Sequence, residues 1–150
     1  MPASHIAYWR TGRSIQIAGG EFGTTTGRGG RCGWFDLPPL KKAIALNGYT
    51  EISLTKLDVL TGLDPIRICV CYNYRGENID YPPELTEDLQ ECTPVYEDIP
   101  GWKDDLTQVK AFDELTGKCQ NYVRRLEELM KVPFSDISVG PGRAQTFKKE

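Results

Sequence analysis

Apolar residues along this chain recur at helical spacing in two segments. In the first, Pro38 or Pro39 falls in an opening helical turn, where proline is tolerated, and Asn47-Gly48 provides a left-handed stop. In the second, Pro133 ends a longer pattern that predicts a helix over residues 113–131. The apolar stripe of that helix comprises Cys119, Tyr122, Val123, Leu126, Leu129 and Met130.

Three other apolar segments predict β-strands, over residues 51–60, 66–74 and 136–139. The second of these is rich in β-branched and aromatic residues, and residues 61–65 between the first two have turn chemistry. The order helix, strand, strand, helix, strand is typical of an α/β protein. Because three strands make a thin sheet, we expect the chain to form part of a larger one.

Residues 76–105 break this pattern, because they contain ten acidic residues and four prolines. A run of charge of this kind usually marks a solvated face. We therefore expect a solvated excursion, with a short strand over residues 93–96. A flap that binds a partner is the alternative.

Composition narrows the class of protein. Hydrophobic residues make up 39% and charged residues 26% of the 150 residues, which is typical of a globular protein. The net charge of −3 argues against binding to nucleic acid through bulk charge. The sequence has no apolar run long enough for a membrane span and no secretory h-region at its start.

Five cysteines at irregular spacing make a poor disulfide framework, and favour a reduced, cytoplasmic protein. Cys69 and Cys71 lie two residues apart, which would place both on one face of a strand as small core residues. His5 is the only histidine and no CxxC pair occurs, so the sequence predicts no metal cage.

The first segment with binding chemistry is Thr24-Thr25-Thr26-Gly27-Arg28, within the glycine-rich stretch EFGTTTGRGGRCGW. Hydroxyls and exposed backbone amides form a nest for oxyanions. An arginine adds a planar fork that fits a carboxylate or a phosphate. The alternative is a mobile loop without a ligand.

The second segment is Thr55-Lys56-Leu57-Asp58, inside or at the end of an apolar strand. A carboxylate there can accept two hydrogen bonds from a guanine edge, while the lysine stem lies along the base. Adenine lacks those two adjacent donors, so a carboxylate that accepts two hydrogen bonds there selects guanine over adenine. An ordinary exposed lysine and aspartate is the alternative.

The third segment, Ser138-Val139-Gly140-Pro141-Gly142-Arg143, leads from a short strand into a glycine-proline turn. Backbone amides beside the serine hydroxyl could cup the carbonyl side of a base. A plain C-terminal turn is the alternative.

These segments, with CGWFDL after the first and LTKLDVLTGLD around the second, occur in an order that resembles the C-terminal third of adenylosuccinate synthetase. The resemblance covers residues 21–147, with residues 1–20 unassigned and divergent, and implies an α/β, P-loop-related fold with a mixed sheet. Members of this family join IMP and L-aspartate at the expense of GTP, with Mg²⁺, in AMP biosynthesis. They are homodimers.

The resemblance also implies residue roles. Thr24 to Arg28 would close on aspartate, with Arg28 holding its carboxylate and reaching toward IMP. Lys56 to Asp58 would hold the guanine of GTP, with Asp58 reading the base. Ser138, Val139, Gly140 and Pro141 would complete the guanine pocket.

Two departures from the family pattern stand out. Gly29 and Gly30 occupy positions where the family has proline and arginine, so we expect weaker binding of GTP and aspartate. The sequence has no match to the family's phosphate loop, catalytic aspartate or catalytic histidine, and no metal ligands. We therefore expect an N-terminally truncated synthetase that is inactive alone. The alternatives are a non-catalytic guanine-nucleotide binder and a fragment that complements a separate chain.

Overall fold

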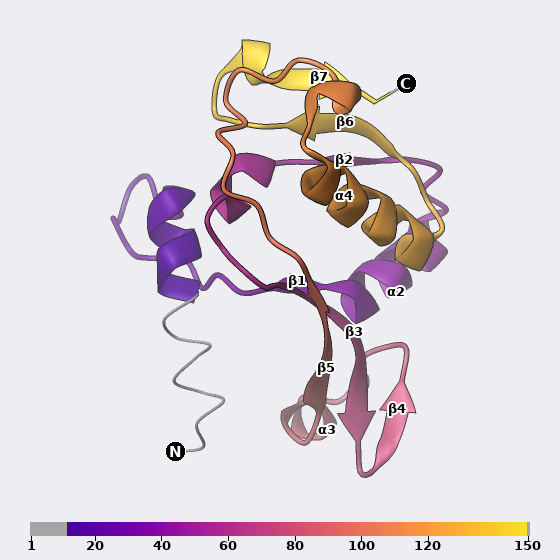
Figure 1. Ribbon diagram of the computed structural model, residues 1–150. Coiled ribbons are helices and arrows are strands. Elements are labelled where there is room, and N and C mark those ends of the chain that lie inside the picture. Colours follow the sequence, from indigo (N-terminus) through magenta and orange to yellow (C-terminus); the bar gives the residue numbers. More distant parts are fainter. Residues whose placement is uncertain (1–11, 150) are drawn as a thin grey trace. The chain divides into compact units, whose positions relative to one another are not determined.

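A computed structural model describes residues 12–149 of the chain (Figure 1), so the expectations for His5 and the rest of residues 1–11 lie outside the described residues. The chain divides into two compact units, Met1–Trp34 and Phe35–Glu150. In the first unit, residues 12–18 are helical and are followed by a hairpin loop. All the named strands and helices belong to the second unit.

The strand β3 (Ile66–Tyr74) organises the first sheet, with the bounds expected from its β-branched and aromatic composition. It pairs in parallel with β1 (Phe35–Asp36) and antiparallel with β4 (Glu77–Ile79) and β5 (Thr93–Ile99). The sheet is therefore mixed, as expected.

A second mixed sheet is built on β6 (Phe134–Ser138). It pairs in parallel with β2 (Ile52–Leu54) and antiparallel with β7 (Thr146–Lys148). The expected strand over residues 51–60 is wrong after Leu54, because Lys56 adopts a left-handed backbone with φ of 59°. A 3-10 helix, η1 (Leu57–Leu60), follows it and buries Leu57.

Both expected helices are present. The helix α2 (Leu37–Asn47) ends at Gly48, whose φ is 64° and whose N–H donates to the Ile44 carbonyl at 2.9 Å. The helix α4 (Gly117–Met130) starts later than expected, because residues 112–114 form a separate 3-10 turn, η2 (Phe112–Glu114). Figure 1 shows α4 between the β2–β6 sheet and α2. Its buried side chains are Cys119, Tyr122, Val123, Leu126 and Met130.

Residues 76–105 contain more regular structure than the short strand expected over residues 93–96. They contain β4, the short helix α3 (Thr86–Gln90) and the whole of β5, which extends the strand expected over residues 93–96. After β5 the chain buries Gly101 and Trp102, which is only 2% exposed. Residues 76–100 are exposed or half-buried, and the buried contacts begin at Gly101.

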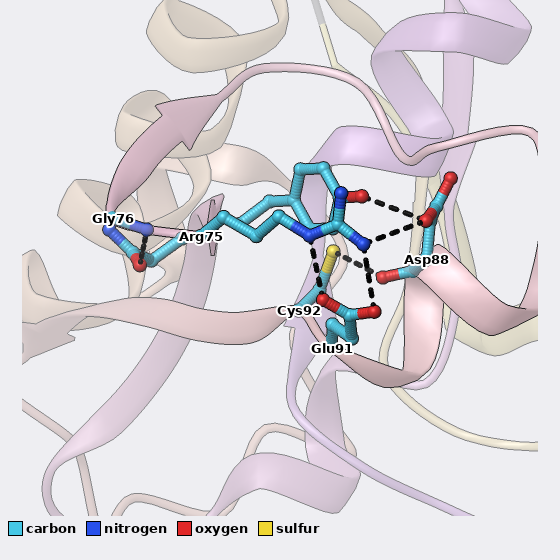
Figure 2. A network of polar contacts seen from close by, with 7 residues as sticks. Arg75, Gly76, Asp88, Glu91 and Cys92 are labelled. Atoms are coloured by element: carbon cyan, nitrogen blue, oxygen red, sulfur yellow. Dashed lines mark hydrogen bonds and ion pairs between the residues drawn. The ribbon is translucent and has the colours of Figure 1, made fainter.

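Several of the acidic residues are held by arginine. At the turn between β3 and β4, Arg75 and Gly76 both have positive φ, of 51° and 92°. Figure 2 shows the Arg75 guanidinium reaching the end of α3, where it donates to Glu91, the residue after the helix, at 2.8 and 2.9 Å and lies 3.6 Å from Asp88. Hydrogen bonding from Arg75 lowers the pKa of Glu91. The Tyr74 hydroxyl donates to Asp88 at 2.7 Å, so the hairpin and α3 are tied together.

A second arginine connects α4 to β5 and gives a pH-dependent prediction. Arg125 donates to both carboxylate oxygens of Glu97, at 2.8 and 2.9 Å, and this hydrogen bonding lowers the pKa of Glu97 below its ordinary 4.5. A lowered carboxyl pKa stabilises the fold above pH 4.5, and that stabilisation is lost as the pH falls through the folded-state value.

We therefore expect Arg125→Met to lower the free energy of unfolding by about 1 kcal/mol at pH 7, because this pair is partly exposed. The difference from the wild type should shrink below pH 4.5. Urea denaturation at several pH values measures it. Arg124→Met is the matched control, since Arg124 donates to Gln120 instead of a carboxylate. An equal loss at every pH would contradict the assignment.

All five cysteines are free thiols. Cys69 and Cys119 are buried, and burial raises the pKa of each thiol to about 12. The expectation that Cys69 and Cys71 share a buried face is wrong for Cys71, which is only half-buried. The register with β5 shifts between the two residues, which interrupts the alternation of faces. Within residues 12–149, the helices are too short or too polar to cross a membrane.

Candidate functional site

The threonine-glycine segment forms the tip of a hairpin in the first unit. The two legs are joined by backbone hydrogen bonds of 2.8 Å, from Gly23 N–H to the Arg28 carbonyl and from Gly30 N–H to the Glu21 carbonyl. At the tip, Gly27 has φ of 64° and donates to the Gly23 carbonyl at 2.8 Å. The positive φ explains a glycine at this position, because side chains rarely adopt that backbone.

The five expected anion-binding residues lie together at this tip, and all five are exposed. The backbone N–H of Arg28 donates to the Thr26 hydroxyl oxygen at 3.3 Å, which is a long bond in an exposed turn. Thr24 and Thr25 complete the row of hydroxyls. Short polar side chains and one guanidinium on an exposed hairpin suit an anionic ligand.

The two glycines that depart from the family pattern lie on the second leg of the hairpin. Neither Gly29 nor Gly30 has positive φ, so the backbone there accepts other residues. A β-carbon at Gly29 would meet the flexible end of the Gln16 side chain. A β-carbon at Gly30 would lie 3.3 Å from the Glu21 carbonyl oxygen, which requires a shift of a few tenths of an ångström.

The other two expected segments meet at one edge of the second sheet. The strands β2 and β6 are parallel, with Leu54 paired with Ile137, so their carboxyl ends lie at the same edge. Lys56–Asp58 follow β2 and Ser138–Pro141 end or follow β6. The 3-10 helix η1, which carries Asp58, also contacts β6. The fold therefore brings together the residues expected to read a base.

Asp58 has an unusual environment for a carboxylate. Its Oδ1 atom is buried and has no hydrogen-bond partner within the part of the chain that the structure describes. An unpaired buried acceptor costs about 1–3 kcal/mol, and more when it is charged. The left-handed backbone of Lys56, immediately before η1, also costs free energy of order 1–3 kcal/mol. Both features are typical of a site arranged for a ligand.

The third segment is a tightly held turn. The Ser138 hydroxyl is buried and donates to the Gly140 carbonyl at 3.1 Å, while Val139 N–H donates to the Gln145 carbonyl at 2.9 Å. These two donors are thus engaged within the turn and stiffen it, and Pro141 is exposed beyond them.

Sequence reasoning missed two residues that support this edge. Thr61 accepts a hydrogen bond from Trp102, 41 residues away, and Gln145 donates to the Thr107 carbonyl, 38 residues away. Neither contact has a local sequence signal, because each depends on how distant segments pack.

Residues 2–147 match the family model for adenylosuccinate synthetase. The chain belongs to the adenylosuccinate synthetase family. The match includes residues 2–20, to which sequence reasoning assigned no resemblance.

Similar proteins agree with this assignment. Adenylosuccinate synthetase 2 of Methanosarcina acetivorans is 78% identical over 139 residues, which are 93% of this chain and 33% of that protein. Adenylosuccinate synthetase of Moorella thermoacetica is 54% identical over 140 residues, with the same coverage. The structure of fully ligated adenylosuccinate synthetase from Plasmodium falciparum matches with a TM-score of 0.90 and 39% identity, over 94% of this chain and 34% of that one. The chain spans about a third of the length of these relatives.

Proposed function

We propose that this chain supplies the guanine pocket and the aspartate loop of an adenylosuccinate synthetase. The complete reaction joins IMP and L-aspartate at the expense of GTP, and gives adenylosuccinate, GDP and phosphate. The observation that carries the proposal is the buried Oδ1 of Asp58, which has no hydrogen-bond partner among residues 12–149, at the sheet edge shared with Ser138–Pro141. Guanine presents N1–H and its 2-amino group side by side, and a carboxylate accepts from both.

The aspartate loop rests on the hairpin tip. Arg28 would form a charge-assisted pair with the substrate carboxylate, and the threonine hydroxyls would supply neutral donors. The exposure of Thr24–Arg28 supports this role, because the groups are open to a ligand.

Magnesium would accompany GTP in the complete reaction. Among residues 12–149, no group of three or more His, Cys, Asp and Glu side chains is placed to hold a metal ion. We assign the described residues no step that involves the metal. From the family resemblance we also propose that the protein is a homodimer and that it is located in the cytoplasm.

Calorimetric titration of the chain with GTP and with ATP tests the guanine pocket. We expect tighter binding of GTP, and equal affinities would overturn the proposal.

A second measurement separates the remaining possibilities. We expect no turnover of GTP, IMP and L-aspartate by the 150-residue chain alone, followed by ultraviolet absorbance. Turnover that appears only on coexpression with the rest of a family protein would favour a complementing fragment.

The loop glycines give a prediction for the hairpin. Gly30→Arg should increase the affinity for L-aspartate about tenfold, because a charge-assisted hydrogen bond contributes about 1.5–3 kcal/mol. The contact of a β-carbon with the Glu21 carbonyl is tight but adjustable, so the variant should fold. Calorimetric titration with L-aspartate measures the change. Gly30→Gln is the control of similar length without the charge, and an unchanged affinity in Gly30→Arg would contradict the expectation.

A further inference from the structure

The extended segment between β5 and η2 connects both halves of the proposed guanine site. We call residues 101–107 the bracket; in Figure 1 they belong to the orange trace that runs from β5 toward β7. Trp102 and Leu106 are 2% and 1% exposed, so the bracket is anchored in the core. Its backbone carbonyls nevertheless bond to residues beside the base-reading segments.

On the Asp58 side, the bracket holds the turn that follows η1. The Trp102 carbonyl accepts Gly62 N–H at 2.8 Å, and the Trp102 indole donates to the Thr61 hydroxyl oxygen at 3.2 Å. The Thr61 hydroxyl in turn donates to the Asp104 carbonyl at 3.3 Å. Thr61 N–H donates to the Asp58 carbonyl at 3.0 Å. Thr61 thus joins the backbone of the base-reading aspartate to the bracket.

On the other side, the bracket holds the glycine-proline turn through one side chain. The Gln145 amide donates to the Thr107 carbonyl at 3.1 Å and accepts Gly142 N–H at 2.9 Å. The Gln145 carbonyl accepts Val139 N–H at 2.9 Å. A β-carbon at Gly140 would clash with the Gln145 side-chain amide. Glycine at this position lets the amide pack directly against the turn.

We propose that Gln145 and Thr61 are positioning residues that set guanine selectivity by holding both base-reading segments to one bracket. The proposal rests on the proposed guanine pocket. Selectivity for guanine requires the Asp58 carboxylate and the Ser138–Pro141 turn at a fixed separation, because two hydrogen bonds to one base edge tolerate little displacement. A misplacement of about 1 Å can cost on the order of 100-fold in a reaction that depends on geometry. Neither positioning residue needs to touch the base.

The test is Gln145→Met in the full chain, since methionine has a similar length but neither donates nor accepts as the amide does. We expect the ratio of GTP to ATP affinity, from calorimetric titration, to fall about tenfold. Gln120→Met is the matched control, because the Gln120 side chain also hydrogen-bonds to the backbone, donating to the carbonyls of Asp113 and Leu115 at the start of α4. It should leave the ratio unchanged.

If Gln145 only stabilised the fold, its substitution would lower the melting temperature and weaken the binding of both nucleotides in parallel. A ratio within twofold of the wild type in Gln145→Met would therefore overturn the proposal. Thr61→Val provides the same test on the other side of the bracket. It removes the hydroxyl while keeping the shape, and we expect the ratio to fall there also.

Amide hydrogen exchange without nucleotide keeps this inference separate from the proposed function. Gly142 N–H should exchange at least tenfold faster in Gln145→Met, because its acceptor is the deleted side-chain oxygen. Val139 N–H bonds to the backbone carbonyl of residue 145 and should change less. Unchanged exchange at Gly142 would overturn the contact between the Gln145 side chain and the glycine-proline turn, and with it the link from that turn to the bracket. Equal binding of GTP and ATP by the wild type would instead overturn the guanine pocket and the selectivity role that rests on it.

Discussion

Asp58→Asn is expected to remove most of the preference for GTP over ATP. The carboxylate offers two acceptors to N1–H and the 2-amino group of guanine. An asparagine side chain has one acceptor only, and its NH₂ donor would face one of these two guanine donors. Loss of a charge-assisted hydrogen bond costs about 1.5–3 kcal/mol. Since about 1.4 kcal/mol is tenfold in affinity, the GTP-to-ATP ratio should fall roughly 10- to 100-fold. Calorimetric titration of both nucleotides measures it.

The same substitution should not destabilise the free chain. Oδ1 of Asp58 is buried without a partner in the described residues, so replacing a charged acceptor by a neutral group removes an unfavourable burial. We expect an unchanged or higher melting temperature in the absence of nucleotide. Opposite signs for binding and stability distinguish a ligand-reading carboxylate from a structural one.

Asp36→Asn is the matched control for this prediction. Asp36 ends β1 in the other sheet, and its Oδ2 accepts the Tyr72 hydroxyl at 2.6 Å. That carboxylate has a partner within the fold, so its substitution should lower stability by about 1 kcal/mol and leave the nucleotide ratio intact. If Asp58→Asn behaved in the same way as this control, the guanine-reading role would be wrong.

The elements predicted well are those whose sequence signals are local. The strand β3 has a continuous run of β-branched and aromatic residues, and Gly48 stops α2 through its own backbone conformation. The strand expected over residues 51–60 failed at Lys56, because a left-handed lysine has no local signature. Alternating apolar residues also fit a short strand followed by a 3-10 helix, in which Leu57 is buried.

The candidate site was predictable in composition but not in arrangement. The segments around Asp58 and Ser138 carry recognisable chemistry, yet only the parallel pairing of β2 with β6 brings them to one edge. The bracket was missed because residues 76–105 read as a solvated acidic run. Trp102 packs at 5.7 Å between ring centroids with Tyr122 of α4, a contact that the intervening sequence does not signal.

Gly101→Ala is expected to cause the largest loss of stability. A β-carbon at this buried glycine would overlap the backbone carbonyl of Leu63, and a carbonyl in a turn cannot rotate away as a flexible side chain can. Overpacking in a well-packed region costs about 1–3 kcal/mol and occasionally more, and the backbone contact places this site at the upper end. We expect about 3 kcal/mol from urea denaturation.

Gly117→Ala separates the clash from the general effect of replacing glycine. A β-carbon at Gly117 meets no atom within 4 Å, and the residue opens α4. Alanine there should stabilise the chain by about 0.4–1 kcal/mol, because it restricts the unfolded chain and favours the helix. Opposite signs at the two glycines are therefore expected. A Gly101→Ala variant as stable as the wild type would mean that the turn at Leu63 yields freely, and the bracket would then be too soft to hold Thr61 beside Asp58.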